Sequence, residues 1–289
     1  MEYFLHILIT IVIYITLSVS FNILFGYTGV LALCHAAFYG IGAYSFALLV
    51  MHVGLGFLPA MFCAVLITAL ISLIIAVPGL RVHWDYMVIF AFSFQMVIYH
   101  IMINWRGLTR GPQGIPGIPQ PEIFGYTFDS PFSFLFLALF LTSVVVYLVK
   151  RLEKSTFGLI LKGIKDDEIA VKSVGKNITI YKVISFAIAA GMAAVAGTMT
   201  ASYLSYISPA NFDLHMSIFV LICLIFGGLG SISGAILGTA ILTALPELLR
   251  FIPMLPSTML GGIRDFIYAI ILLVFILYRP QGLLGKAGK

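Results

Sequence analysis

The stretch Leu161–Lys182, LKGIKDDEIAVKSVGKNITIYK, interrupts an otherwise apolar chain. Eight of its 22 positions are Lys, Asp or Glu, although charged residues make up only 9% of the whole sequence. Long apolar runs, 132–149 and 183–201, lie on either side of it. One short charged segment between two such runs indicates a chain that lies mostly in lipid and reaches water in few places.

The composition supports the same class of protein. Of 289 residues, 61% are hydrophobic, whereas a soluble domain carries roughly 25% charged residues to keep its surface wet. Runs of about 20 apolar residues, as a spanning helix requires, recur along the chain. We therefore predict an all-α, polytopic transmembrane helical bundle of about 8–10 spans in a single domain, residues 1–289. The runs lie near 3–24, 29–50, 57–77, 86–103, 132–149, 183–201, 215–235, 236–249 and 264–279.

The charges of the loops predict the orientation in the membrane. Loop 150–182 carries eight Lys and Arg residues against four acidic ones, and the C-terminal tail is also basic. The other long connection, the Gly/Pro-rich segment 104–131, has two Arg balanced by Glu122 and Asp129. By the positive-inside rule, loop 150–182 and the C-terminus are expected in the cytoplasm, and segment 104–131 and the N-terminus outside. The net charge of +5 thus indicates orientation and not nucleic-acid binding.

Small residues recur at four-residue spacing, which places them on one face of a helix. Such ridges let helix backbones approach closely in lipid. Packing within a compact bundle and sliding surfaces of a moving transporter both remain open as interpretations. The ridges are Gly230, Gly234 and Gly238; Ala189, Ala193, Gly197 and Ala201; and Ala32, Ala36 and Gly40. The glycine-rich stretch GYTGVLALCHAAFYGIGAY, Gly26–Tyr44, further indicates an interrupted span.

Motifs for catalysis and nucleotide binding are missing from the sequence. GGLGSISG, Gly227–Gly234, has glycine spacing unlike the dinucleotide fingerprint, and GLILKGIK, Gly158–Lys165, has Ile164 where a P-loop needs Lys. The three cysteines lie far apart within apolar runs, as packing residues do. We expect a protein that is not an enzyme and that holds no metal or cofactor of its own.

Several apolar runs, such as 57–77, 132–149 and 183–201, contain no ionisable residue. Proton- or voltage-driven machinery places such residues within the membrane, so we expect the energy source outside this chain. Polar residues within other runs are uncharged: Asn22, Gln95 and a neutral His35. Hydrogen bonding between helices is their commoner role, and contact with a solute is the alternative.

Within the opening stretch the pattern predicts a short cytoplasmic helix over 165–174. Its acidic start and Lys172 near its end suit the helix dipole, and Gly175 followed by Asn177 is typical of a stop. Ile164, Val171 and Val174 are expected on one face. From these residues alone, an ordinary solvated loop and a lever for a soluble partner are equally good interpretations.

Four segments together resemble the LivM/LivH family, the permease subunits of branched-chain amino-acid ABC importers, and are closest to the LivM branch. They cover most of residues 79–250 in the family's order. The segments are GLRVHWDYMVI, NWRGLTRGPQGIPGIP, GIKDDEIAVKSVGKNITIYKVISFAIAAGMAAVAG, and YISPANF through GGLGSISGAILGTAILTALPELLR. The general importer signature, E-A-A, three residues, then Gly, is only approached by Glu168, Ala170 and Gly175, because Ile169 replaces the first Ala and the Gly is one residue late.

The resemblance implies an ABC importer permease fold in the bacterial inner membrane, surrounded by lipid, without nucleic acid. It implies a homologous second permease, two ABC ATPase subunits that hold ATP and Mg²⁺, and an extracytoplasmic substrate-binding protein that docks on loops including 105–128. The helix in loop 150–182 would be the coupling helix that contacts an ATPase subunit. Replacing Asp166, Asp167 and Glu168 together should then uncouple uptake from ATP hydrolysis and leave the membrane fold intact.

The implied solute is a branched-chain or other small hydrophobic amino acid. Related permeases import urea or short amides, and a stand-alone secondary transporter or channel is a further alternative. The expected ATPase-coupling residues are Gly163, Asp166, Asp167, Glu168, Ala170, Lys172 and Gly175. The expected residues of the translocation path are Asn22, His35, Phe92, Phe94 and Gln95.

Overall fold

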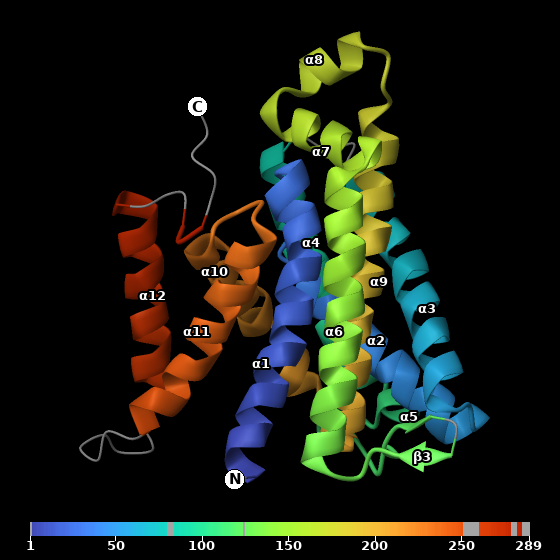
Figure 1. Ribbon diagram of the computed structural model, residues 1–289. Helices are drawn as coiled ribbons and strands as arrows, with labels where there is room; N and C mark the ends of the chain where they lie inside the picture. Colours follow the sequence, from blue (N-terminus) through green and yellow to red (C-terminus); the bar gives the residue numbers. More distant parts are fainter. Residues whose placement is uncertain (1, 80–83, 124, 251–259, 279–281, 285–289) are drawn as a thin grey trace.

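The computed structural model describes residues 2–79, 84–123, 125–250, 260–278 and 282–284, and most of them are helical (Figure 1). In this part of the chain, seven helical segments are long and apolar enough to cross a membrane, and a shorter apolar helix covers Ile232–Glu247. The all-α, polytopic prediction is confirmed. The apolar helices are α1 (Glu2–Phe21, continued by the π-helix η1, Asn22–Tyr27), α2 (His35–Leu48, continued by the π-helix η2, Leu49–Val53), α3 (Phe57–Gly79), α4 (Trp84–Asn104), α6 (Pro131–Lys154), α9 (Ile178–Leu204), α10 (Leu214–Gly227), α11 (Ile232–Arg250) and α12 (Leu260–Tyr278).

Short elements lie toward one end of the bundle (Figure 1). They are α5 (Arg106–Thr109), the 3-10 turns η3 (Gly111–Gln113) and η4 (Pro209–Phe212), β1 (Ile115–Pro116), β2 (Glu122–Ile123), β3 (Tyr126–Thr127) and β4 (Tyr206–Ile207). β1 pairs antiparallel with β4, and β2 pairs antiparallel with β3. Glycines and prolines in segment 104–131 prevent a continuous helix there, so only short helical turns and two-residue strands form. The N-terminal end of α1 lies at this end of the bundle, because His6 contacts Tyr203 just before β4.

The charged segment lies at the opposite end of the bundle (Figure 1). It folds into α7 (Thr156–Asp166) and α8 (Glu168–Ser173), which connect α6 to α9. Residues 282–284 also lie toward this end, where the backbone N–H groups of Leu283 and Leu284 donate to carbonyls of Phe226 and Gly227 at the end of α10. The segment 104–131 and the loop 150–182 therefore project from opposite ends, as the charge pattern predicts.

The core forms around α2 and α9, which pack through small residues. Ala189, Ala193 and Ala201 of the predicted ridge on α9 are fully buried. A Cβ atom added to Gly197 on the same ridge would collide with the carbonyl oxygen of Tyr39 and lie 2.7 Å from the backbone nitrogen of Ala43. Close packing of helix backbones thus explains this ridge.

The other two ridges are only partly formed. Gly234 and Gly238 on α11 face the backbone of Gly227 on α10, whereas Gly230 lies in the α10–α11 loop with a φ of +80°. Ala32 likewise precedes α2, so it does not continue the helix face of Gly40. The predicted boundary between spans 215–235 and 236–249 is wrong for a related reason: the chain turns at residues 228–231, and sequence hydropathy does not mark that turn.

Replacing Gly197 by Ala is expected to destabilise the bundle by about 1–3 kcal/mol, because the added methyl group overpacks the α2–α9 contact. The matched control is Gly107→Ala in α5, where an added Cβ meets no atom within 4 Å. Thermal unfolding of the two purified variants in detergent measures the difference. Equal melting temperatures for both would contradict the packing account.

Helix α2 begins inside the bundle and not at its surface. After η1 the chain turns back beside α1 through residues 28–34, among which Val30, Ala32 and Cys34 are buried, and α2 starts at His35. The predicted span 29–50 is therefore helical only from His35, six residues later than predicted. Non-helical backbone within a membrane protein is tolerated where other parts of the protein cover it, as here. The interruption predicted within Gly26–Tyr44 is confirmed.

Candidate functional site

Asp167 divides the charged segment into its two helices. Its backbone is extended (φ −157°, ψ 105°), and its side chain accepts hydrogen bonds from the backbone nitrogens of Ile169 (2.8 Å) and Ala170 (3.1 Å). The predicted single helix over 165–174 is wrong, because Asp167 caps α8 instead of continuing α7. The face predicted for Ile164, Val171 and Val174 does not form either, since Ile164 belongs to α7 and is buried, whereas Val174 is 76% exposed.

α7 lies against the inner end of the bundle through one apolar side. Ser155 caps the helix by accepting from the backbone nitrogen of Gly158 (3.2 Å). Leu161 and Ile164 are buried beneath it. Gly158 allows this approach, since a Cβ there would collide with the carbonyl oxygen of Leu152 at the end of α6. The turn from α6 into α7 is therefore closely packed.

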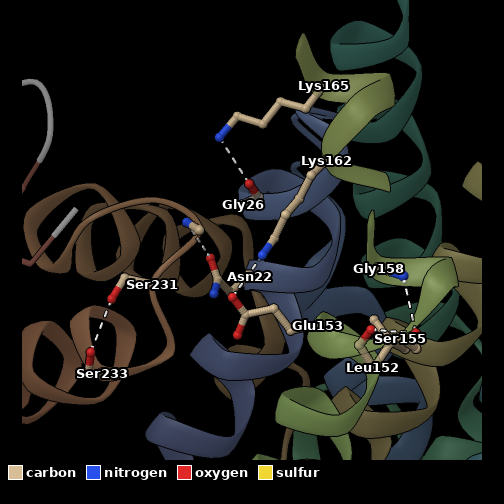
Figure 2. Close-up of polar contacts among 11 residues, drawn as sticks. Asn22, Gly26, Leu152, Glu153, Ser155, Gly158, Lys162, Lys165, Ser231 and Ser233 are labelled. Atoms are coloured by element: carbon tan, nitrogen blue, oxygen red, sulfur yellow. Dashed lines mark hydrogen bonds and ion pairs between the residues drawn. The ribbon is translucent and has the colours of Figure 1, made fainter. Parts of the chain in front are cut away.

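Two lysines attach α7 to different helices (Figure 2). Nζ of Lys162 lies 2.9 Å from Oε1 of Glu153 at the end of α6. Nζ of Lys165 donates to the carbonyl oxygen of Gly26 in η1, at 3.0 Å. α7 is thus linked both to the preceding helix and to the end of α1, which lies far away in the sequence.

α8 offers an exposed, partly apolar surface. No residue of this helix is buried, and Ile169 is 76% exposed, as is Val174 just after it. Glu168 pairs with Lys182 of α9, so the helix is held at its start while Ile169 faces outward. Exposed apolar residues beside charged ones are typical of a surface that binds another protein.

The glycines around α8 allow its position. A Cβ on Gly163 would lie 3.2 Å from a methyl carbon of Val171, so the glycine lets α8 fold back against α7. Gly175 has a φ of +77°, which a side chain rarely permits, and turns the chain toward α9. Asn177 then caps α9 by accepting from the backbone nitrogen of Ile180 (3.3 Å). The expected coupling residues Gly163, Asp166, Asp167, Glu168, Ala170, Lys172 and Gly175 thus lie together in α7, α8 and the adjoining turns.

Gln95 of α4 joins the starts of α2 and α10 within the bundle. Its Oε1 accepts from the backbone nitrogen of Ala37 (2.7 Å), and its Nε2 donates to the carbonyl oxygen of Phe212 (2.9 Å). Oγ of Ser217 accepts from the backbone nitrogen of Ala36 (2.9 Å). These buried contacts give side-chain partners to the backbone nitrogens of Ala36 and Ala37 and to the carbonyl of Phe212, at the starts of two helices.

The other residues expected in the path separate into buried and outward-facing positions. His35 shares a hydrogen bond with Ser20 through Nε2 (2.7 Å) and stacks on Phe21. Phe94 is partly buried near Phe38, whereas Phe92 is 39% exposed on the outer side of α4. The structure therefore brings His35 and Gln95 to the start of α2 and leaves Phe92 on another surface.

Asn22 lies at a third place, the π-helical end of α1 (Figure 2). It is fully buried, and its Oδ1 accepts from the backbone nitrogen of Gly230 in the α10–α11 loop (2.9 Å). Neither this link nor the Lys165–Gly26 link is evident from the sequence. In the sequence, Lys165 is only one of several positive charges in the loop. A π-turn produces no regular spacing of hydrophobic residues from which it could be predicted.

The chain is similar to a family of known proteins. Residues 3–278 match the family described as branched-chain amino acid transport system / permease component. The chain belongs to this family. Its family membership and its apolar helices make the protein a membrane permease.

Curated relatives agree over most of the permease. It is 34% identical to the high-affinity branched-chain amino acid transport system permease protein LivM of Salmonella typhimurium and 33% identical to that of Escherichia coli, in each case over 94% of this chain and 68% of the relative. A probable branched-chain amino acid transport permease protein LivM of Methanocaldococcus jannaschii is 23% identical over 81% of this chain and 70% of the relative. No solved structure matches. The permease is a multi-pass membrane protein and a transport component, not an enzyme.

Proposed function

We propose that the permease forms half of the translocation pathway of an ATP-driven importer in the bacterial inner membrane, and that α7 and α8 receive the force from an ATPase subunit. The observation that carries this proposal is the arrangement of these two helices. One side of α7 is buried on the bundle, while Ile169 and Val174 beside it are 76% exposed. A unit fixed to the membrane helices on one side and open on the other suits transfer of movement from a soluble partner.

ATP and Mg²⁺ bind to the partner ATPases in this account, and the permease contributes no group to hydrolysis. The ATPases change the permease only because they bind its two conformations with different free energies. Their affinity for α8 is therefore expected to differ between the two conformations of the permease. At the opposite end, the β1–β4 pair and segment 105–128 offer the docking surface for a substrate-binding protein.

A second, homologous permease is proposed to cover the outer side of α4. This span is the least buried of the seven, with 22% of its most apolar window inside the protein. Its exposed residues include Ser93, His100 and Asn104, which are costly against lipid tails. By contrast, the exposed side of α3 is a purely apolar stripe, as lipid contact requires: Phe62, Leu66, Leu70 and Ile74. The outer side of α4 therefore faces the partner permease and the pathway.

A cysteine at Phe92 on this side of α4 is expected to react with a membrane-impermeant maleimide in the assembled complex, because thiolates form only where water reaches. The matched control is Phe62→Cys on the lipid-facing stripe, with Cys63→Ser in both variants. The labelling rate at position 92 should exceed that at position 62 by at least about tenfold, and it should change when ATP analogues trap the complex. Equal, slow labelling of both would remove Phe92 from the pathway.

The proposed solutes are branched-chain amino acids, as the names of the relatives indicate. The described buried polar residues of the interior are uncharged groups such as Asn22, Gln95 and Ser217. Because these residues offer no fixed charge to balance a charged solute, the interior favours small solutes with no net charge. Competition of unlabelled leucine, isoleucine, valine, urea and acetamide against labelled leucine uptake tests the assignment. Inhibition by urea or acetamide alone would point to the alternative importer class.

Purification of the tagged permease from its native membrane tests the assembly. Two ATPase copies and a second permease are expected to co-elute in mild detergent. A permease that elutes alone, and still moves leucine across vesicles without ATP, would contradict the proposed function and favour a stand-alone carrier or channel.

A further inference from the structure

The end of α1 departs from regular helix where α7 reaches it. Asn22–Tyr27 forms a π-helix, a wider turn that occurs frequently at functional sites. The last carbonyl groups of a helix have no partner within it, and a cation there is favoured by the helix dipole. Lys165 supplies that cation from α7 by donating to the Gly26 carbonyl at 3.0 Å. The aliphatic part of its side chain lies beside Gly29, where an added Cβ would be 3.4 Å from Cγ of the lysine.

The same π-turn holds the α10–α11 loop from its other side. Oδ1 of Asn22 accepts from the backbone nitrogen of Gly230 at 2.9 Å (Figure 2). Nδ2 of Asn22 has no hydrogen-bond partner among the described residues, so the contact to Gly230 is the one that orients this buried amide. Movement of the π-turn therefore shifts the acceptor on which the loop rests.

Gly26 makes both contacts possible at once. Its carbonyl oxygen binds Lys165, and its missing side chain leaves room for the amide of Asn22. A Cβ at this position would collide with Oδ1 of Asn22 and lie 2.9 Å from the backbone nitrogen of Gly230. The contacts of α7 and of the α10–α11 loop thus meet at a single helical turn.

From this arrangement we infer that Lys165, Gly26 and Asn22 form an internal transmission step, in which α7 moves the end of α1 and α1 moves the α10–α11 loop. In this role they are positioning residues, which act through their contacts with one another and with the α10–α11 loop. The inference rests on the proposed function, since it takes the movement of α7 from an ATPase. Lys162 is linked to the π-turn in another way: it pairs with Glu153 at the adjacent end of α6, and its Nζ lies 5.4 Å from the centre of the Tyr27 ring, whereas Lys165 hydrogen-bonds the Gly26 carbonyl.

The neighbouring lysines provide a matched test in the reconstituted complex with its ATPases and binding protein. Lys165→Met is expected to lower the leucine transported per ATP hydrolysed by about tenfold, the size of effect that loss of one charge-assisted hydrogen bond can produce. Lys165→Arg should restore the ratio to within about threefold, because the guanidinium can also donate to a carbonyl. Lys162→Met removes the ion pair with Glu153 and the weaker contact with the Tyr27 ring, so it should lower the ratio by no more than about threefold.

A double-mutant cycle tests whether Lys165 and Asn22 act in one step. Asn22→Ala alone should lower the transport ratio in the same way, and combination with Lys165→Met should add little, since residues of one network are not additive. Equal ratios for Lys165→Met and Lys162→Met would overturn the inference while the proposed function stands. Loss of the ATPases from Lys165→Met would also overturn it, because the inference gives Lys165 no part in docking. If the unmodified complex needs no ATP, the proposed function itself fails.

Discussion

A variant with Ile169→Asp and Val174→Asp is expected to lose its ATPase subunits and its uptake while the membrane bundle stays folded. Each side chain is 76% exposed, and no residue of α8 is buried. The substitutions therefore remove nothing from the core but place charges where an apolar contact with the ATPase is proposed. Loss of two central contacts should weaken ATPase binding by at least about a hundredfold. Co-purification and vesicle uptake measure the two effects.

Two controls separate docking from general effects of charge. Ile169→Val with Val174→Ile keeps the apolar surface and should retain the ATPases. Tyr126→Asp places a carboxylate on a residue that is 61% exposed in β3, at the opposite end of the bundle, and should also retain them. Full uptake by the double Asp variant would show that force enters the permease elsewhere.

Replacing Gln95 by Leu is expected to destabilise the bundle by about 2–4 kcal/mol, because it leaves buried polar groups without good partners. The carbonyl oxygen of Phe212 would lose its donor, and the backbone nitrogen of Ala37 would keep only a 3.1 Å contact with the carbonyl of Cys34. The starts of α2 and α10 should then separate, so uptake falls as well. Thermal unfolding in detergent and vesicle uptake measure these losses.

The control for Gln95 is Ser93→Ala on the same helix. Ser93 is exposed, and its hydroxyl bonds only to the carbonyl oxygen of Ile89 one turn earlier. Its removal should change stability by no more than about 0.5 kcal/mol. A Gln95→Leu variant as stable as Ser93→Ala would show that α2 and α10 do not depend on this side chain.

Much of this architecture follows from the sequence because hydropathy and small-residue spacing act locally. The apolar runs predict the spans, and the four-residue spacing of Ala189, Ala193 and Gly197 predicts the close packing of α9. The charged stretch likewise marks the loop that forms α7 and α8. These predictions agree with the structure because each residue's preference for lipid, water or a close helix contact matches its position in the fold.

Other features depend on contacts between distant residues, which a single sequence does not encode visibly. Three adjacent acidic residues make equally good helix starts, so the capping role of Asp167 is hidden between Asp166 and Glu168. The start of α2 inside the bundle depends on Gln95 and Ser217, which lie far from it in the sequence. Path residues expected from their polar or aromatic character therefore separate into distinct places, and their roles in transport remain predictions.

The central claim is that ATPases acting on α7 and α8 drive solute through this permease. Its most direct test is leucine uptake by proteoliposomes that hold the purified complex, with the binding protein on one side and either ATP or a non-hydrolysable analogue on the α8 side. We predict uptake against a gradient with ATP and none with the analogue. Equal accumulation under both conditions, or by the permease without its ATPases, would contradict the account.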